Sequence, residues 1–238
     1  MSETEKHTAK LYIVGTPIGN LGDMSSRAVD VLNTADIIAC EDTRTSGHLL
    51  KHFGIHGMTT SFHQHNEHKK TPDLIDRMRN GETVALISDA GMPAISDPGF
   101  LLARAAHQAG IMVIPIPGPV AGVTVLAASG LPSDRFVFEG FLPQKKGRKT
   151  RIEALREETR TIVFYESPYR VVKLLGELQD VFGENRLSAV GRELTKKFEE
   201  IRRGTLIDLH NEFSNRPSIK GEFVVIVSGL GYTEEAAE

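Results

Sequence analysis

The chain has 238 residues, 40% of them hydrophobic and 25% charged, which excludes a disordered or fibrous protein and allows one large domain or two compact ones. A net charge of −3 excludes a simple nucleic-acid-coating protein. There is no uncharged apolar run of about 18 residues and no signal-peptide core in the first ten residues, so we expect a cytoplasmic protein that does not span a membrane.

The first half alternates apolar runs with helical patterns. Strands are predicted at residues 11–15, 35–40, 84–88 and 111–117, and helices at residues 25–34, around Leu49, and at 99–108. This order predicts a mostly parallel sheet covered by helices. The continuous apolar runs VALIS and IMVIP suit strands that are buried on both faces.

The loop after the first strand, GTPIGNLGDMSS, begins at Gly15 and leads into a helix that starts near Asp23 or Ser25. It follows the carboxyl end of a strand, where open α/β sheets bind ligands. Its glycines lack the spacing of a dinucleotide fingerprint, and Pro17 removes an amide that a phosphate cradle would use. A ligand-binding loop and a plain structural turn therefore both remain as interpretations.

The second loop, SDAGMPAISDPG at residues 88–99, combines glycine, proline and small residues, so its backbone can approach a ligand closely. Asp89 and Asp97 are its only charges. A carboxylate at a strand end can accept hydrogen bonds from both hydroxyls of a ribose. For Asp97 we prefer another role, as the cap of the helix that starts near Pro98 and Gly99.

A third loop, PIPGPVAGV, also joins a strand to a helical run. Three such loops on one parallel sheet predict one cleft with backbone donors and little charge, which suits a neutral or zwitterionic cofactor. The phosphate-binding pattern GxxxxGK[ST] is missing from the sequence. We predict no metal site, because His63, His65 and His68 match no familiar ligand spacing.

After the Pro-rich PIPGP, five further strand candidates occur at residues 135–141, 161–167, 187–194, 198–206 and 222–229. The short gap between the third and fourth of these allows an antiparallel pair, which predicts a mixed sheet. We therefore predict two α/β domains, at residues 1–121 and 122–238.

Basic residues cluster twice in the second half. The run PQKKGRKTR contains Lys145, Lys146, Arg148, Lys149 and Arg151, and a second group contains Lys196, Lys197, Arg202 and Arg203. Each cluster is either a handle for phosphates or an ordinary solvated charge run. Two clusters in one domain favour a polyanionic substrate.

In chain order, the segments GTPIGNLGD, EDTRTS, SFHQHNE, SDAGMPAISDPG, PIPGPVAG, FEGFLP, FYESPYR and GREL resemble a bacterial family that methylates a ribose 2′-hydroxyl of cytidine in small-subunit (16S) ribosomal RNA. This family belongs to the tetrapyrrole-methylase-like group. The resemblance covers about residues 11–228. It implies two αβα domains, a homodimer, and S-adenosylmethionine bound in the cleft between the domains.

Carried over by position, the resemblance implies that the cofactor is lined by Pro17, Asp89, Ala90, Gly91, Met92, Ala94, Ile95, Val120, Ala121, Tyr165 and Glu166. S-adenosylmethionine carries no phosphate, which agrees with Gly-rich loops that lack lysine. Corphyrin-modifying relatives read GDP in the second loop, where this chain has Ser88, Asp89 and Ala90.

A ribose hydroxyl is a weak acid, so a general base or a hydrogen-bonding group that orients it would help its methylation. The candidate carboxylates are Glu41, Asp42 and Glu166. The candidate substrate contacts are Arg44, Lys145, Lys146, Arg148, Lys149, Arg170 and Lys196. Glu41 and Arg44 have a structural alternative, since residues at this spacing can pair at the start of a helix.

Two other functions remain open at this point. A tetrapyrrole methylase would share the cofactor cleft, although the basic loop favours RNA over a macrocycle. A ribosome-binding factor without catalysis would bind no cofactor.

Overall fold

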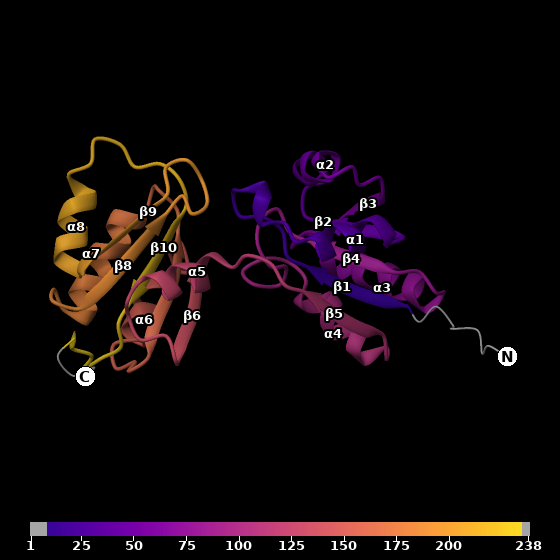
Figure 1. Ribbon diagram of the computed structural model, residues 1–238. Coiled ribbons are helices and arrows are strands. Elements are labelled where there is room, and N and C mark those ends of the chain that lie inside the picture. The colour runs from indigo at the N-terminus through magenta and orange to yellow at the C-terminus, as the bar shows by residue number, and fades with distance from the viewer. Residues whose placement is uncertain (1–8, 235–238) are drawn as a thin grey trace. The chain divides into compact units, whose positions relative to one another are not determined.

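A computed structural model describes residues 9–234, and the chain divides into two compact units between Val120 and Ala121 (Figure 1). The elements of the first unit are β1 (Lys10–Val14), the 3-10 helix η1 (Leu21–Asp23), α1 (Ser26–Thr34), β2 (Ile37–Cys40), α2 (Thr43–His52), β3 (Met58–Ser61), α3 (Glu67–Arg79), β4 (Val84–Ile87), α4 (Phe100–Gln108) and β5 (Met112–Ile116).

The five strands of the first unit form one parallel sheet in the order β3-β2-β4-β1-β5, which confirms the predicted parallel sheet. Apolar side chains of α1 and α2 pack on one face, and those of α3 and α4 pack on the other. Ser25 caps α1 by accepting a hydrogen bond from the Ala28 amide at 3.1 Å, as expected of a residue that precedes a helix.

The prediction that both VALIS and IMVIP are buried on two faces is half wrong. All four residues of β4 are buried, whereas β5 lies at the sheet edge and Met112 is 52% exposed. The apolar composition of a strand does not show whether other strands pair with it on both sides or on one side only. Strand β3 and helix α3 are not predicted from the sequence, because MTTS carries little apolar signal and the apolar stripe of α3 is interrupted by charges and Pro72.

The second unit contains α5 (Ala121–Ala128), β6 (Phe136–Phe141), α6 (Arg148–Glu153), β7 (Thr161–Glu166), α7 (Val171–Phe182), β8 (Leu187–Arg192), β9 (Glu200–Thr205), α8 (Leu206–Ser214) and β10 (Phe223–Val227). Its sheet has the order β6-β7-β10-β8-β9. Strands β6 and β7 are parallel, β7 and β8 each pair antiparallel with β10, and β8 and β9 form the predicted antiparallel pair, so the mixed sheet is confirmed.

The two faces of this second sheet are covered unequally. Helices α6, α7 and α8 pack against one face and enclose the main core of the unit, while α5 lies on the opposite face (Figure 1). Packing of α5 is close, because a Cβ atom on Gly191 of β8 would lie 2.4 Å from a methyl of Val125. Within residues 9–234, no helix combines the length and the apolar character that a membrane crossing needs.

Candidate cofactor and substrate sites

Three loops meet at the carboxyl edge of the first sheet, as predicted. The Gly15 amide donates to the Ile116 carbonyl at 3.0 Å, and Thr16 and Gly91 exchange two backbone hydrogen bonds of 2.9 and 3.1 Å. A Cβ atom on Gly15 would lie 2.6 Å from the Gly118 Cα atom, so only glycine allows these backbones to approach so closely. The loops after β1, β4 and β5 therefore form one continuous backbone surface.

The loop after β4 has an unusual backbone. Ala94 and Ser96 have φ angles of 68° and 64°, in the left-handed region that residues with a side chain rarely adopt. The Thr16 hydroxyl supports the start of the loop by donating to the Ser88 carbonyl at 3.2 Å. Asp89 and Ala90 are exposed beyond that support. Strained backbone held in place by its surroundings is typical of ligand-binding sites.

Asp97 does not cap α4, so that prediction is wrong. The cap residue is Gly99, and no side chain accepts a hydrogen bond at this helix start. Burial raises the pKa of the Asp97 carboxyl and the nearby charge of Asp89 raises it further, while a hydrogen bond with Ser88 opposes the shift. Asp97 therefore belongs to a group of acids at the sheet edge.

The other members of this acidic group follow β2. Burial raises the pKa of Glu41, with further contributions from the charges of Asp97 and Asp89. The Asp42 amide donates to Asp89 Oδ1 at 3.2 Å, which ties the loop after β2 to the loop after β4. Candidate residues from two separate segments of the sequence thus lie together.

Asp42 itself is the cap residue of α2. It accepts a hydrogen bond from the Arg44 amide at 2.8 Å and pairs with the Arg44 guanidinium at 3.1 Å, and these contacts lower its pKa. The alternative pairing of Glu41 with Arg44 is therefore not the one observed. A stabilised carboxylate is a weak base, which leaves Glu41 as the better base of the two.

The remaining predicted cofactor residues fall into two groups. Pro17, Gly91, Met92, Ala94, Ile95 and Val120 belong to the connected loops of the first unit. Ala121 and Tyr165 belong to the second unit, where the Tyr165 hydroxyl accepts a hydrogen bond of 2.9 Å from the Gly122 amide at the start of α5.

Glu166 is not placed as a catalytic base would be. Its side chain is 1% exposed, and its carboxylate accepts hydrogen bonds from Arg148 at 3.0 Å and from Arg170 at 2.8 Å. Arg148 also binds Glu177 at 2.7 Å. Both oxygens of Glu166 are therefore occupied by arginine side chains in the interior of the unit, which fits a structural ion pair better than a catalytic base.

The run PQKKGRKTR divides into buried and exposed parts. Arg148 is 4% exposed on its side chain, which corrects its expected role as a substrate contact. Arg151 pairs with Glu139. Lys145 and Lys146 are exposed in the loop between β6 and α6, and the Lys149 side chain is 87% exposed on α6. Lys149 lies 3.8 Å from Glu153, so Lys145 and Lys146 carry the accessible charge of this run.

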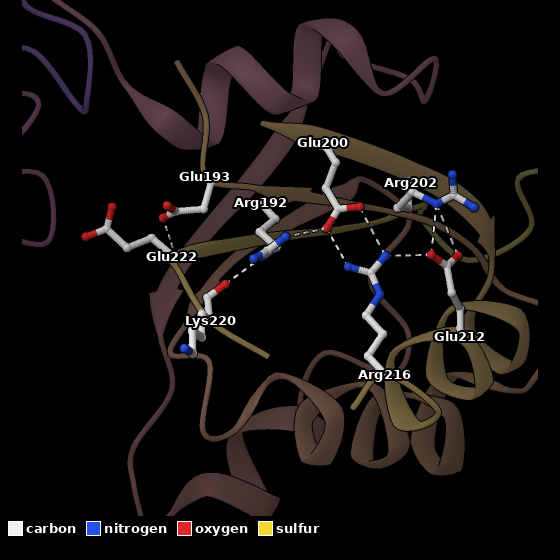
Figure 2. Close-up of polar contacts among 8 residues, drawn as sticks. All are labelled: Arg192, Glu193, Glu200, Arg202, Glu212, Arg216, Lys220 and Glu222. Atoms are coloured by element: carbon white, nitrogen blue, oxygen red, sulfur yellow. Dashed lines mark hydrogen bonds and ion pairs between the residues drawn. The ribbon is translucent and has the colours of Figure 1, made fainter. Parts of the chain in front are cut away.

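Lys196, Arg202 and Arg203 of the second basic group pair with carboxylates, while the Lys197 ammonium lies 5.6 Å from the centre of the Phe198 ring. Figure 2 shows Arg216 between Glu200 and Glu212, with Arg202 on Glu212 at 2.9 Å and Arg192 on Glu200 at 3.0 Å. Arg203 pairs with Glu234, and Lys196 lies 3.0 Å from Glu193 and 2.7 Å from Glu222. This network joins β8, β9 and α8, so the expectation of a second phosphate site, with Lys196 as a substrate contact, loses its support.

The histidine-rich segment forms a turn between β3 and α3. The rings of His63 and His65 have centroids 6.0 Å apart, and His68 lies on α3. Across the part of the chain that the structure describes, no three His, Cys, Asp or Glu side chains are grouped to hold a metal ion.

A match to a known protein family identifies the family of this chain. Residues 10–210 match the model of the tetrapyrrole (corrin/porphyrin) methylases. The chain belongs to this family. Two solved structures share the fold: uroporphyrin-III C-methyltransferase from Thermus thermophilus, with a TM-score of 0.63, and a cobalt precorrin-4 methyltransferase, with a TM-score of 0.66.

Those two structures are 23% and 19% identical in sequence and cover 92% and 96% of this chain and 94% and 98% of their own. Curated relatives are more similar. Proteins named "Ribosomal RNA small subunit methyltransferase I" are 51% identical in Mesorhizobium japonicum, over 91% of this chain and 74% of the relative, and 51% identical in Xylella fastidiosa, over 95% and 84%. This family member is an S-adenosylmethionine-dependent methyltransferase.

Sequence reasoning missed two features of these sites. The position of Asp97 before Pro98 and Gly99 predicts a helix cap, whereas the effect of its charge on the pKa of Glu41 depends on two loops meeting in space. The exposed aromatic residues of β6 were also missed. Their signal was present in FEGF, where a glycine interrupts an aromatic strand.

Proposed function

We propose that the protein transfers a methyl group from S-adenosylmethionine to the ribose 2′-hydroxyl of a cytidine in 16S ribosomal RNA. The observation that carries this proposal is about 50% identity to relatives named for small-subunit ribosomal RNA, over nine-tenths of the chain. We further propose that it acts in the cytoplasm as a homodimer, as its resemblance to the family implies.

The residues of the first unit fit the proposed cofactor. S-adenosylmethionine supplies a methyl group bound to a positively charged sulfur, and it carries a ribose, an adenine and an amino acid group but no phosphate. The loop at residues 88–99 contains no lysine or arginine, and its exposed Asp89 suits ribose hydroxyls. Pro17, Ala90, Gly91, Met92, Ala94, Ile95 and Val120 would complete this part of the site.

Glu41 is the residue we propose to act on the ribose hydroxyl. Its raised pKa brings the carboxylate closer to the value that suits a general base, whereas Asp42 is paired with Arg44. Holding the hydroxyl in line with the methyl group would supply much of the remaining rate enhancement. Arg44, with an 89% exposed side chain, lies next to this group as a candidate phosphate contact.

The test of this function is transfer of radiolabelled methyl groups to three substrates: small ribosomal subunits, protein-free 16S RNA and a tetrapyrrole. We expect label in ribosomal RNA, as subunits or as free RNA, and none in the macrocycle. Label in the tetrapyrrole would support the methylase chemistry of the two solved neighbours and overturn the RNA assignment. Absence of transfer together with absence of cofactor binding would point to a non-catalytic ribosome-binding factor.

Glu41→Gln tests the proposed base. The rate constant for methyl transfer should fall by about 100-fold or more, because a positioned general base typically contributes 10² to 10⁴ in rate. S-adenosylmethionine affinity should stay near the wild-type value. The wild-type rate should rise with pH as Glu41 loses its proton, and this rise should be missing in the variant. A variant that keeps the wild-type rate and pH profile would remove Glu41 from the chemistry.

A further inference from the structure

Strand β6 carries a row of aromatic side chains that a β-bulge brings onto one face. In a regular strand Phe138 and Gly140 would share a face, and Phe141 would lie on the other. The register with β7 shifts between Phe138 and Gly140, and Gly140 has a φ of 63°. As a result both Phe138 and Phe141 contact Tyr165 of β7, with ring centroids 5.2 and 5.5 Å apart.

This aromatic strip, defined as Phe138, Phe141 and Tyr165, lies on the face that α5 covers. Helix α5 packs over the inner strands, with Gly122 against Val163 of β7 and Val125 against Gly191 of β8. Edge strand β6 remains outside this cover, so Phe138 is 37% exposed and Phe141 57% exposed. Large aromatic rings left this accessible on a strand are typical of a binding surface.

The strip continues directly into the basic loop. Leu142 to Gly147 contains Lys145 and Lys146 and no acidic residue. Buried Arg148 donates to the Pro143 carbonyl at 3.4 Å while its guanidinium is bound by Glu166 and Glu177, so the two ends of the loop are tied to the core. Aromatic rings and uncompensated positive charge are therefore adjacent along one chain segment.

We propose that the aromatic strip stacks unpaired bases of the RNA substrate, while Lys145 and Lys146 bind the phosphates next to those bases. This inference rests on the proposed function and specifies how the RNA is bound: as a single strand with its bases unstacked. Bases in single strands stack on aromatic side chains, and neighbouring lysines track the backbone. Positive charge in the loop that directly follows the rings favours this occupant over an apolar protein partner.

The experiment measures the affinity of the full-length protein for three RNA probes: a single-stranded oligonucleotide, a duplex of the same length, and an abasic single strand that keeps its phosphates. The double variant Phe138→Leu/Phe141→Leu should bind the single strand about 10-fold or more weakly, since stacking of each base is worth about 1 to 3 kcal/mol. Its affinity for the abasic strand should be unchanged. Lys145→Gln/Lys146→Gln should weaken binding of both and flatten the salt dependence.

Phe198→Leu is the matched control, because Phe198 is 63% exposed beside Lys197 but lies outside the strip. It should keep wild-type affinity for every probe. The inference is overturned if the strip variant keeps wild-type affinity, as this control should, or if its affinities for the abasic and the ordinary single strand fall equally. It is also overturned if the strip variant changes the oligomeric state of the protein instead of its RNA affinity. Failure of the wild-type protein to bind the single-stranded probe would also overturn the inference, whereas the proposed function is overturned only by the methyl-transfer assay on ribosomal subunits and RNA, which separates the two results.

Discussion

At the residue scale, burial and neighbouring charge decide which candidates remain. The sequence named Glu41, Asp42 and Glu166 as carboxylates of equal standing, since composition cannot show what each one contacts. In the structure Glu166 is held by two arginines, Asp42 caps a helix, and Glu41 has a raised pKa. Asp97 joins Glu41 although the sequence assigned it to a helix end.

Asp97→Asn should stabilise the protein at neutral and alkaline pH. A carboxyl whose pKa is raised on folding favours the folded state when protonated, and this contribution is lost as the pH rises through the folded-state pKa. Asparagine removes the cost of a buried charge at pH 8. Urea denaturation should therefore show a higher free energy of unfolding for the variant at pH 8 and a vanishing difference near pH 3, below the usual aspartate pKa of about 3.9. A difference that is constant with pH would contradict this account.

Arg148→Met should destabilise the second unit by about 3 kcal/mol, because it removes the buried guanidinium that joins Glu166 to Glu177 and leaves the buried Glu166 with Arg170 alone. Thermal or urea denaturation measures the effect. Arg156→Met is the control, since Arg156 is exposed and a surface substitution changes stability by only about 0.5 kcal/mol or less. Equal stability of the two variants would show that the buried cluster does not hold this unit together.

At the scale of elements, loop positions were predictable where strand patterns were strong. The runs LYIV and VALI mark strands by their apolar residues, so the loops after them fall at the carboxyl edge of a parallel sheet. The edge position of β5, the polar strand β3 and the bulge in β6 were not predictable, because each depends on which strand lies alongside. The same limit hid the aromatic strip.

Gly15→Ala tests the meeting of the three loops. The added methyl would approach the Gly118 backbone to 2.6 Å, so the loops must separate, and we expect a loss of about 1 to 3 kcal/mol in stability together with weaker S-adenosylmethionine binding. Gly47→Ala in α2 is the matched control, because no atom lies within 4 Å of its added methyl and alanine favours a helix. Calorimetric titration that shows unchanged cofactor affinity for Gly15→Ala would place the cofactor elsewhere.

At the scale of the whole molecule, alternation of strands and helices was enough to predict a parallel sheet followed by a mixed one. The reaction was harder to predict than the fold, since each motif taken alone can also have a purely structural role. The order of many motifs along the chain indicated the methyltransferase family, and the match over residues 10–210 established it. Family membership does not choose between a macrocycle and an RNA, so the substrate rests on the relatives and on the accessible lysines.

The central claim is methylation of a ribose hydroxyl in small-subunit RNA, and the most direct measurement is the chemical position of the transferred methyl. RNA labelled by the purified protein would be hydrolysed with alkali, which needs a free 2′-hydroxyl to cleave the chain. We expect the label in an alkali-resistant dinucleotide whose first nucleoside is a 2′-O-methylated cytidine. Label recovered in single nucleotides methylated on the base would contradict it.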